Sequence, residues 1–551
     1  MHANLKSNPK MSRNRTATVE VLIILLLTCV PLFIRLPYRA NIFLSWEGAY
    51  RISQGQLPFR DFGTPLGGMY WVIPALFFKI FGAKMVTLIK AQFFINIVAG
   101  LAFRSILRSL SVNQGIRLAA VFLFCISYSF FNFWPWYNHS VIVYELVGLA
   151  FLFRYMRDGG GGWKRMGWLA GAAFFICCSF LTKQDGGGIA FLIAFVLLAV
   201  YSLFEKQWKP LVVFAGSFVV ILFLMIAPFL KYGFGYWFNH GQAPHSSRVS
   251  AFDIADEFFG FSQWIKFYFF ITVLLVLARY RSWAALMADK KGVLLVALTW
   301  GILGEAAIFQ VTSYTPPDNN IFFHSFAIGC ILSLMGPLLQ LNFERPRIMI
   351  VVLAGIMLWW SGIWWKYTQR LASKLLVPQS AAVSPTGENV VNRATYTINT
   401  DTARDIPMSQ WVETGLPSFS RITMPPPTVD GIHRLMGMDL VQHSHGDLRV
   451  LNMSELTPLA VEIPYKLERN SQLPLWFHLG VGMFNRQAQE YESRVGQHYY
   501  DLILFEYIPR LNNFYAFRVR DSIRLHYRQV DSFLAPRQGL TSKGMIEVYV
   551  K

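Results

Sequence analysis

The sequence contains few charged residues and few cysteines. Only 15% of its 551 residues are charged, 54% are hydrophobic, and the mean hydropathy is +0.37. A soluble protein usually carries about 25% charged residues, so this chain has too few to cover a water-exposed surface. All five cysteines lie in apolar segments without the spacing of a zinc site, which argues against a disulfide scaffold. A Gly-rich nucleotide-binding loop and internal repeats are also lacking.

Long apolar runs take the place of those features. Runs of about 20 apolar residues, the length that crosses a bilayer, recur along the first two-thirds of the chain. They lie at 18–37, 66–82, 85–105, 116–134, 138–155, 166–182, 187–204, 210–231, 261–280, 293–311, 321–340 and 348–366. The first run is too long for a signal-peptide core, and no small-residue cleavage site follows it. The pattern predicts a polytopic α-helical membrane protein that begins with an uncleaved span.

The net charge of +19 follows the apolar segments. Residues 1–366 hold 31 Lys and Arg against 14 Asp and Glu, whereas residues 367–551 hold 19 against 17. The bias of Lys and Arg toward cytoplasmic loops explains this excess, so nucleic acid is not an expected partner. An even number of crossings must separate the basic N-terminus from the basic loop at 104–117. The short segment 66–82, which contains Pro74 and Lys79, is therefore predicted to be an interfacial or re-entrant helix on the outer side.

These rules predict eleven spans and three regions. Residues 1–17 form a cytoplasmic N-terminus, and residues 18–366 form a membrane domain whose first outer loop is 38–65. Residues 367–551 are expected to form an extracytoplasmic α/β domain. Its predicted elements are strands at Leu448–Leu451, Tyr500–Phe505, Ile523–Phe533 and Met545–Val550, and a helix at Gly482–Val495.

The first outer loop carries more cations than the charge rule allows. Arg39, Arg51 and Arg60 all lie in the predicted loop, and Glu47 and Asp61 are its acids. The arginines fit two explanations, binding of an anionic phosphate and snorkelling to lipid headgroups. A carboxylate beside several cations suits a general base or a metal ligand, and structural pairing of the acids with Arg51 or Arg60 is the alternative.

The stretch Ser45–Gly82, which covers most of this loop and the predicted interfacial helix, resembles the first outer loop of the GT-C superfamily of membrane glycosyltransferases, in the branch that contains the protein mannosyltransferases and the aminoarabinose transferase of lipid A. Trp46 stands where that family usually has the first acid of a pair. The matching residues, in the same order and nearly the same spacing, are Glu47, Tyr50, Gly55, Pro58, Phe59, Arg60, Asp61, Phe62, Pro65, Leu66, Phe81 and Gly82. The resemblance implies that Glu47, or else Asp61, is the catalytic base, with Tyr50 as a substrate contact.

Further residues are predicted from other segments. Lys183, in the run LTKQDGG, matches a family position near the lipid phosphate, so Arg60, Lys183 and Arg51 are the expected phosphate ligands. Asn138 and His139 occupy a place where relatives have polar residues, although they could equally cap the next helix. The long outer loop 232–260 suggests substrate gating, with His245 and Arg248 as substrate contacts. Two acids, Glu145 and Glu305, lie within predicted spans, where carboxylates usually face a cavity or a partner such as Lys90.

Together these features predict a hexosyl- or pentosyltransferase of the bacterial inner membrane. Its donor would be a sugar on polyprenyl phosphate, and its acceptor a glycan, lipid or protein. No cofactor motif is evident, and a requirement for a divalent cation is left open. The alternatives are a carrier or flippase for lipid-linked sugars and a polysaccharide polymerase or ligase. The sugar, the acceptor, the stereochemistry and the oligomeric state are not predicted.

Overall fold

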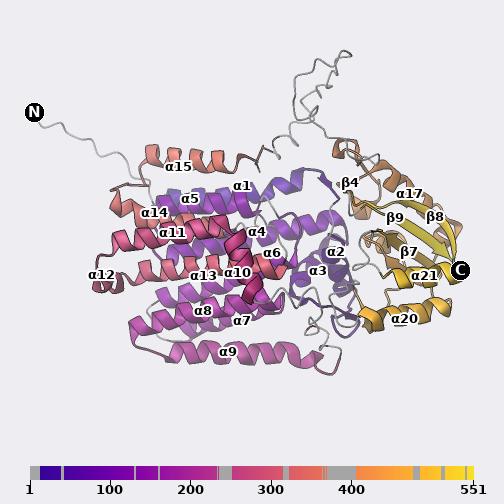
Figure 1. Cartoon of the computed structure of the whole chain (residues 1–551), viewed down its shortest axis with the longest axis horizontal. Coiled ribbons are helices and arrows are strands. Elements are labelled where there is room, and N and C mark those ends of the chain that lie inside the picture. Colours follow the sequence, from indigo (N-terminus) through magenta and orange to yellow (C-terminus); the bar gives the residue numbers. More distant parts are fainter. Residues whose placement is uncertain are drawn as a thin grey trace, which may run out of the picture.

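The computed structural model shows a bundle of helices packed side by side with their axes roughly aligned, and an α/β domain at one end of the bundle (Figure 1). It describes residues 13–38, 42–129, 132–158, 162–232, 234, 237, 251–313, 322–362, 364–365, 368, 405–475, 484–509, 516–539 and 543–551.

The helical body follows the predicted apolar segments. Each of the twelve segments holds a helix, which confirms the polytopic helical class. The helices are α1 (Arg13–Cys29), α3 (Met69–Phe81), α4 (Met85–Ser109), α5 (Gln114–Phe124), α6 (Tyr137–Arg157), α7 (Trp163–Phe180), α8 (Gln184–Glu205), α9 (Lys209–Ile226), α11 (Gln263–Arg279), α13 (Lys290–Ser313), α14 (Phe323–Leu338) and α15 (Pro346–Trp359). Two short helices, α10 (Ala251–Gly260) and α12 (Trp283–Ala288), lie in connections.

Not every one of these helices has full spanning length. Among the described residues, six are long and apolar enough to cross a membrane, and the bent pair α10–α11 raises the number to seven. The remaining predicted spans are α7, with 18 residues, and the shorter helices α5, α14 and α15. The count of eleven spans includes these four, and for them it stays a prediction.

The first loop adds a helix that the sequence analysis did not predict. This helix, α2 (Ile42–Ser53), packs against α3, and both lie between the parallel helices and the C-terminal domain (Figure 1). Two short strands of the loop pair in parallel with C-terminal strands: β1 (Leu36–Pro37) with β4 (Ile422–Met424), and β2 (Phe62–Gly63) with β6 (Asn470–Pro474). The first loop and the C-terminal domain therefore lie at the same end of the helical body.

The C-terminal domain is built on a four-stranded sheet in the order β5-β7-β9-β8. The strands are β5 (Val450–Met453), β7 (Leu502–Tyr507), β9 (Met545–Val550) and β8 (Arg528–Leu534), with β5 and β7 parallel and the other pairs antiparallel. Strand β3 (Val412–Glu413) pairs with β4. The helices are α17 (Pro426–Met436), α18 (Asp439–Gln442), α19 (Leu459–Glu462), α20 (Phe484–Gly496) and α21 (Phe517–His526).

The predicted strand Ile523–Phe533 is wrong in its first part. Residues 523–526 end α21, and the strand begins only at Arg528. The helix buries Val519 and Ile523, four residues apart, which is the spacing of one helical face. The other predicted strands and the predicted helix at 482–495 agree with β5, β7, β9 and α20 to within a few residues.

Candidate active site

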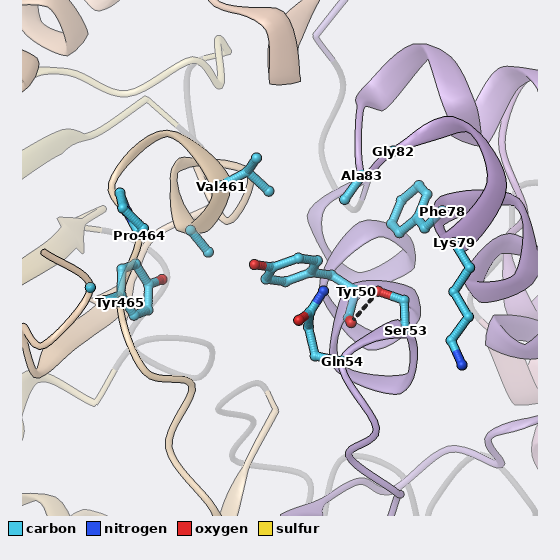
Figure 2. Close-up of a pocket in the computed structure, with 12 residues that line it drawn as sticks. Tyr50, Ser53, Gln54, Phe78, Lys79, Gly82, Ala83, Val461, Pro464 and Tyr465 are labelled. Atoms are coloured by element: carbon cyan, nitrogen blue, oxygen red, sulfur yellow. Dashed lines mark hydrogen bonds between the residues drawn. The ribbon is translucent and has the colours of Figure 1, made fainter.

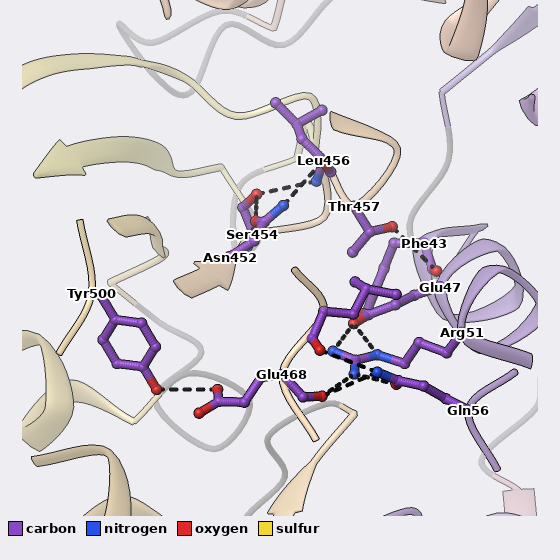
Figure 3. A network of polar contacts seen from close by, with 11 residues as sticks. Phe43, Glu47, Arg51, Gln56, Asn452, Ser454, Leu456, Thr457, Glu468 and Tyr500 are labelled. Atoms are coloured by element: carbon purple, nitrogen blue, oxygen red, sulfur yellow. Dashed lines mark hydrogen bonds and ion pairs between the residues drawn. The ribbon is translucent and has the colours of Figure 1, made fainter. Parts of the chain in front are cut away.

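Glu47 and Arg51 form an ion pair on α2. They are four residues apart on one face of the helix, with 2.9 Å between a guanidinium nitrogen and Oε1. Arg51 also donates to Oε1 of Gln56 and to the carbonyl of Glu468, both at 3.0 Å (Figure 3). Only 15% of the Glu47 side chain is exposed. Burial raises the pKa of Glu47, while the charge and hydrogen bond of Arg51 oppose that rise.

Trp46 occupies a packing position. Its side chain is fully buried and stacks on Tyr50 with 4.6 Å between ring centroids. It also packs against Phe78 of α3, with 5.9 Å between the ring centroids. At the position where the resembled family has an acid, this chain has a core residue that joins α2 to α3.

A pocket of about 470 Å³ lies where α2 and the end of α3 meet the C-terminal domain. The Tyr50 ring extends toward Tyr465 of the C-terminal domain, and Ser53, Gln54 and Lys79 add polar groups (Figure 2). Glu47 does not line this pocket, but its charge acts on Tyr465. Burial, and then the Glu47 charge, raise the pKa of that tyrosine.

Asp61 closes the turn that presents Arg60. Its carboxylate accepts from the Leu57 N–H at 2.8 Å and pairs with Arg60 at 2.6 Å. Burial opposes ionisation of Asp61, but the hydrogen bonds from Arg60 and Leu57 outweigh it and lower its pKa. Phe59, in the same turn, has a φ of 66°, an uncommon and strained conformation for a bulky residue. A lowered pKa makes Asp61 a weaker base than Glu47.

The turn before α8 contacts the residues between the first loop and α3, and the first residue of α3. Gly67 N–H donates to the Thr182 carbonyl at 3.2 Å, and Met69 N–H donates to the Leu181 carbonyl at 3.4 Å. A Cβ atom at Gly67 would lie 1.6 Å from that Leu181 oxygen, so only glycine fits there. The structure thus joins the two segments that carry the family resemblance.

Lys183 lies on this turn, one residue before α8. Its ammonium pairs with Asp185 at 2.7 Å and lies over the ring of Phe309, 4.4 Å from the centroid. Phe59, the neighbour of Arg60, shares a small apolar cluster with Leu181, Phe234 and Trp237. Arg60 and Lys183 are therefore carried by two turns that pack together.

Asn138 and His139 begin α6 close to the first loop. The Ser45 hydroxyl of α2 donates to the carbonyl of Pro135, just before that helix. His139 is buried, and one of its ring nitrogens lies 3.3 Å from Nε2 of Gln92. Asn138 Oδ1 is buried, and no hydrogen bond reaches it from the described residues. His245 and Arg248, predicted as substrate contacts, lie outside the described residues, as does Arg39.

Glu305 does not pair with Lys90, the partner suggested by the sequence. Lys90 lies over the Phe81 ring, 4.7 Å from its centroid. Glu305 and Glu145 are both buried, and their carboxylate oxygens have no hydrogen-bond partner among the described residues, but the charges of Glu145 and Lys183 both act on Glu305. This buried carboxyl pair links the core of the helical body to the Lys183 turn.

Several residues at the site come from the C-terminal domain, for which the sequence analysis found no motif. Tyr465 forms a pocket wall, and Glu468 supplies a carbonyl to Arg51.

Arg35 pairs with Glu413 at 2.7 Å. Arg35, just before the first loop, and the two described arginines of that loop, Arg51 and Arg60, therefore all pair with carboxylates of the protein. Within the described ranges, no group of three or more His, Cys, Asp or Glu residues is placed to hold a metal ion.

Comparison with known proteins finds similarity in structure only. No protein-family model matches the chain, and no curated protein matches it in sequence.

Three solved structures illustrate the similarity. ArnT from Cupriavidus metallidurans in the apo state is 12% identical, with a TM-score of 0.49 over 97% of this chain and 98% of that one. The arabinofuranosyltransferase AftD from Mycobacteria is 12% identical, with a TM-score of 0.44 over 98% of this chain and 40% of that one. The Archaeoglobus fulgidus oligosaccharyltransferase is 11% identical, with a TM-score of 0.42 over 90% and 70%. At such identities they do not determine which residues act here.

Proposed function

We propose that this protein is a membrane glycosyltransferase that moves a sugar from a polyprenyl-phosphate donor to an acceptor at the end of the helical body that carries the C-terminal domain. One observation carries the proposal. The buried carboxylate of Glu47 and the cations Arg60 and Lys183 gather at this end, where a pocket opens beside Tyr50. Proton transfer and stabilisation of a phosphate leaving group need this combination of groups.

Glu47 is the proposed base. It would take the proton from an acceptor hydroxyl as that oxygen attacks the anomeric carbon of the donor. Its raised pKa makes it a stronger proton acceptor than an exposed glutamate, and a base is most effective when its pKa lies near the working pH. Arg51 holds the carboxylate in place through the pair at 2.9 Å.

Arg60 and Lys183 are the proposed phosphate ligands. As the bond between the anomeric carbon and the phosphate oxygen breaks, negative charge grows on the lipid phosphate, and fixed cations stabilise it. Each cation now pairs with a neighbouring carboxylate, Asp61 or Asp185. A donor phosphate would join these pairs as a further acceptor. A single displacement of this kind inverts the configuration of the sugar.

The pocket beside Tyr50 is the proposed acceptor site. Glu47 does not line it, so the reacting hydroxyl would extend from the pocket toward Glu47, whose charge acts on Tyr465 in the pocket wall. Its volume of about 470 Å³ suits a small molecule or one end of a larger chain. Tyr50 and Tyr465 offer aromatic faces, while Ser53 and Gln54 offer hydrogen bonds. These groups suit a sugar, a hydroxylated lipid or a peptide side chain equally well, so the acceptor class is left open.

The proposal includes a place in the cell. With the basic loops on the cytoplasmic side of a bacterial inner membrane, the first loop and C-terminal domain face outward. We expect cysteines introduced at Ser53 and Ser471 to react with the same membrane-impermeant reagent added from outside. Labelling of one from outside and the other only from inside would contradict this topology.

A proteoliposome assay tests the function. A transferase consumes labelled polyprenyl-phosphate sugar and releases polyprenyl phosphate when acceptor is present. A carrier or flippase moves the donor across the bilayer unchanged. Donor that is translocated but never cleaved would overturn the proposal. Turnover before and after chelation with EDTA decides whether a divalent cation takes part.

A further inference from the structure

A second pocket lies at the other end of the helical body. Its volume is about 560 Å³, and it is bounded by the α4–α5 turn, the α11 and α14 ends, the start of α13 and the loop after α14. In Figure 1, α12, which connects α11 to α13, marks the end of the body farthest from the C-terminal domain. This pocket is therefore separate from the candidate active site.

Two cations line this pocket together with one acid. Lys291 donates to the Ser111 hydroxyl at 2.7 Å, and the guanidinium of Arg279 lies near the ring of Tyr280, 5.7 Å from its centroid. Neither cation forms an ion pair with a carboxylate among the described residues. The acid, Asp289, is already bound inside the protein. Its two oxygens accept from the Tyr280 hydroxyl at 2.7 Å and from Gly292 N–H at 2.9 Å.

The Asp289 contacts depend on glycine at position 292. A Cβ atom there would lie 2.4 Å from the Tyr280 hydroxyl and 2.5 Å from an Asp289 oxygen. The acid thus binds the Tyr280 hydroxyl and the Gly292 N–H and forms no ion pair with either cation of the pocket. The net result is a hollow with positive charge, hydroxyl and amide groups from Ser333 and Asn342, and apolar wall residues such as Leu334.

We propose that this pocket binds a phosphate group, with Arg279 and Lys291 as its ligands. Guanidinium and ammonium groups are the side chains that bind phosphate in proteins, and the volume is within the usual range of ligand sites. The same chemistry comes from two sources, the headgroup of an anionic phospholipid and a soluble phosphate compound. The apolar wall residues suit the glycerol and acyl portion of a lipid. This proposal does not depend on glycosyl transfer, so a negative transferase assay would not contradict it.

Cations at this end of a membrane protein also attract anions without a site, so the experiment needs a control with equal charge. The test variant is Arg279→Ala/Lys291→Ala. The control is Arg281→Ala/Lys290→Ala, which removes the same charge from neighbouring positions that do not line the pocket. Lys290 pairs instead with Glu205 at 3.0 Å.

Native mass spectrometry of the full-length purified protein measures retained lipid, with dioleoylphosphatidylglycerol and dioleoylphosphatidylcholine as probes. We expect the test variant to bind phosphatidylglycerol at least about tenfold more weakly than wild type, since it loses two charged hydrogen bonds. The control should change less than about twofold. Equal losses in both variants, or no loss in the test variant, would overturn the site.

Inorganic phosphate distinguishes the source. Competition by phosphate at concentrations near that of the lipid indicates a soluble phosphate ligand, whereas retention of the lipid despite excess phosphate indicates a lipid headgroup. If the alanine variant fails to fold, Arg279→Gln/Lys291→Gln keeps hydrogen-bonding capacity and removes only the charge. The same binding criterion then applies to it.

Discussion

Replacement of Glu47 by glutamine tests the proposed base. Glutamine keeps the shape of the side chain and an oxygen that can accept from Arg51. Arg51 also keeps its acceptors on Gln56 and on the Glu468 carbonyl. The network should therefore survive, and expression and donor binding should stay near wild type. What is lost is the group that takes the proton, and general-base catalysis contributes about 10²–10⁴-fold.

The assay is turnover of labelled donor by purified protein in proteoliposomes. We expect Glu47→Gln to lower kcat by at least about a hundredfold. Because the base must be ionised, wild-type turnover should rise with pH through the raised pKa of Glu47 and then level off. The variant should lack that rise.

The matched control is Glu468→Gln. Its side chain is 20% exposed, much like that of Glu47, and it pairs with Arg494 in the same interface. This variant also removes one carboxylate charge, yet we expect turnover close to wild type. If Asp61→Asn abolishes turnover while Glu47→Gln leaves it unchanged, the base has been misassigned. If neither change affects turnover, the reasoning from Glu47 fails and a carrier becomes the better account.

Three further predictions concern other parts of the chain. Arg60→Ala and Lys183→Ala should each weaken polyprenyl-phosphate binding roughly tenfold to a hundredfold, and unchanged binding in a fluorescence titration would reduce these residues to anchors. Gly67→Ala should lower turnover and the melting temperature, because the added methyl group has no room beside the Leu181 carbonyl. Gly188→Ala, the control, places its methyl group in open space and should change neither quantity. Equal melting curves for the two variants would contradict this prediction. Burial raises the pKa of Glu506 from 4.5 to about 8, so the folded state binds its proton more tightly than the unfolded state. Stability from this group is fully present below pH 4.5 and is lost as pH rises to about 8. Glu506→Gln should then flatten the decline of the melting temperature over that window, and an unchanged slope would exclude Glu506 as its cause.

Much of the helical body could be predicted from composition. An apolar run of about 20 residues has few stable forms in a membrane other than a helix, and every predicted segment holds one. The short helix α3 was found because its length and Pro74 set it apart. The start of β8 was missed because Ile523 has high strand propensity, yet tertiary packing of the α21 face overrides it.

The candidate site was only partly predictable. The acids and cations of the first loop follow one another along the chain, so a local motif reveals them. Tyr465 and Glu468 reach the same place from more than 400 residues away, through the pairing of β2 with β6. A single sequence carries no signal for such long-range contacts. The sequence also does not predict that Asp61 accepts a hydrogen bond from the Leu57 N–H, because this contact depends on the conformation of the turn.

Mass spectrometry of lipid-linked glycans in a strain that lacks this protein tests the central claim most directly. If the protein is a glycosyltransferase, the strain should accumulate the polyprenyl-phosphate sugar together with an acceptor that lacks that sugar, and the wild-type gene should restore the product where Glu47→Gln does not. Normal glycosylation of every acceptor in the deletion strain, or full rescue by Glu47→Gln, would contradict the account.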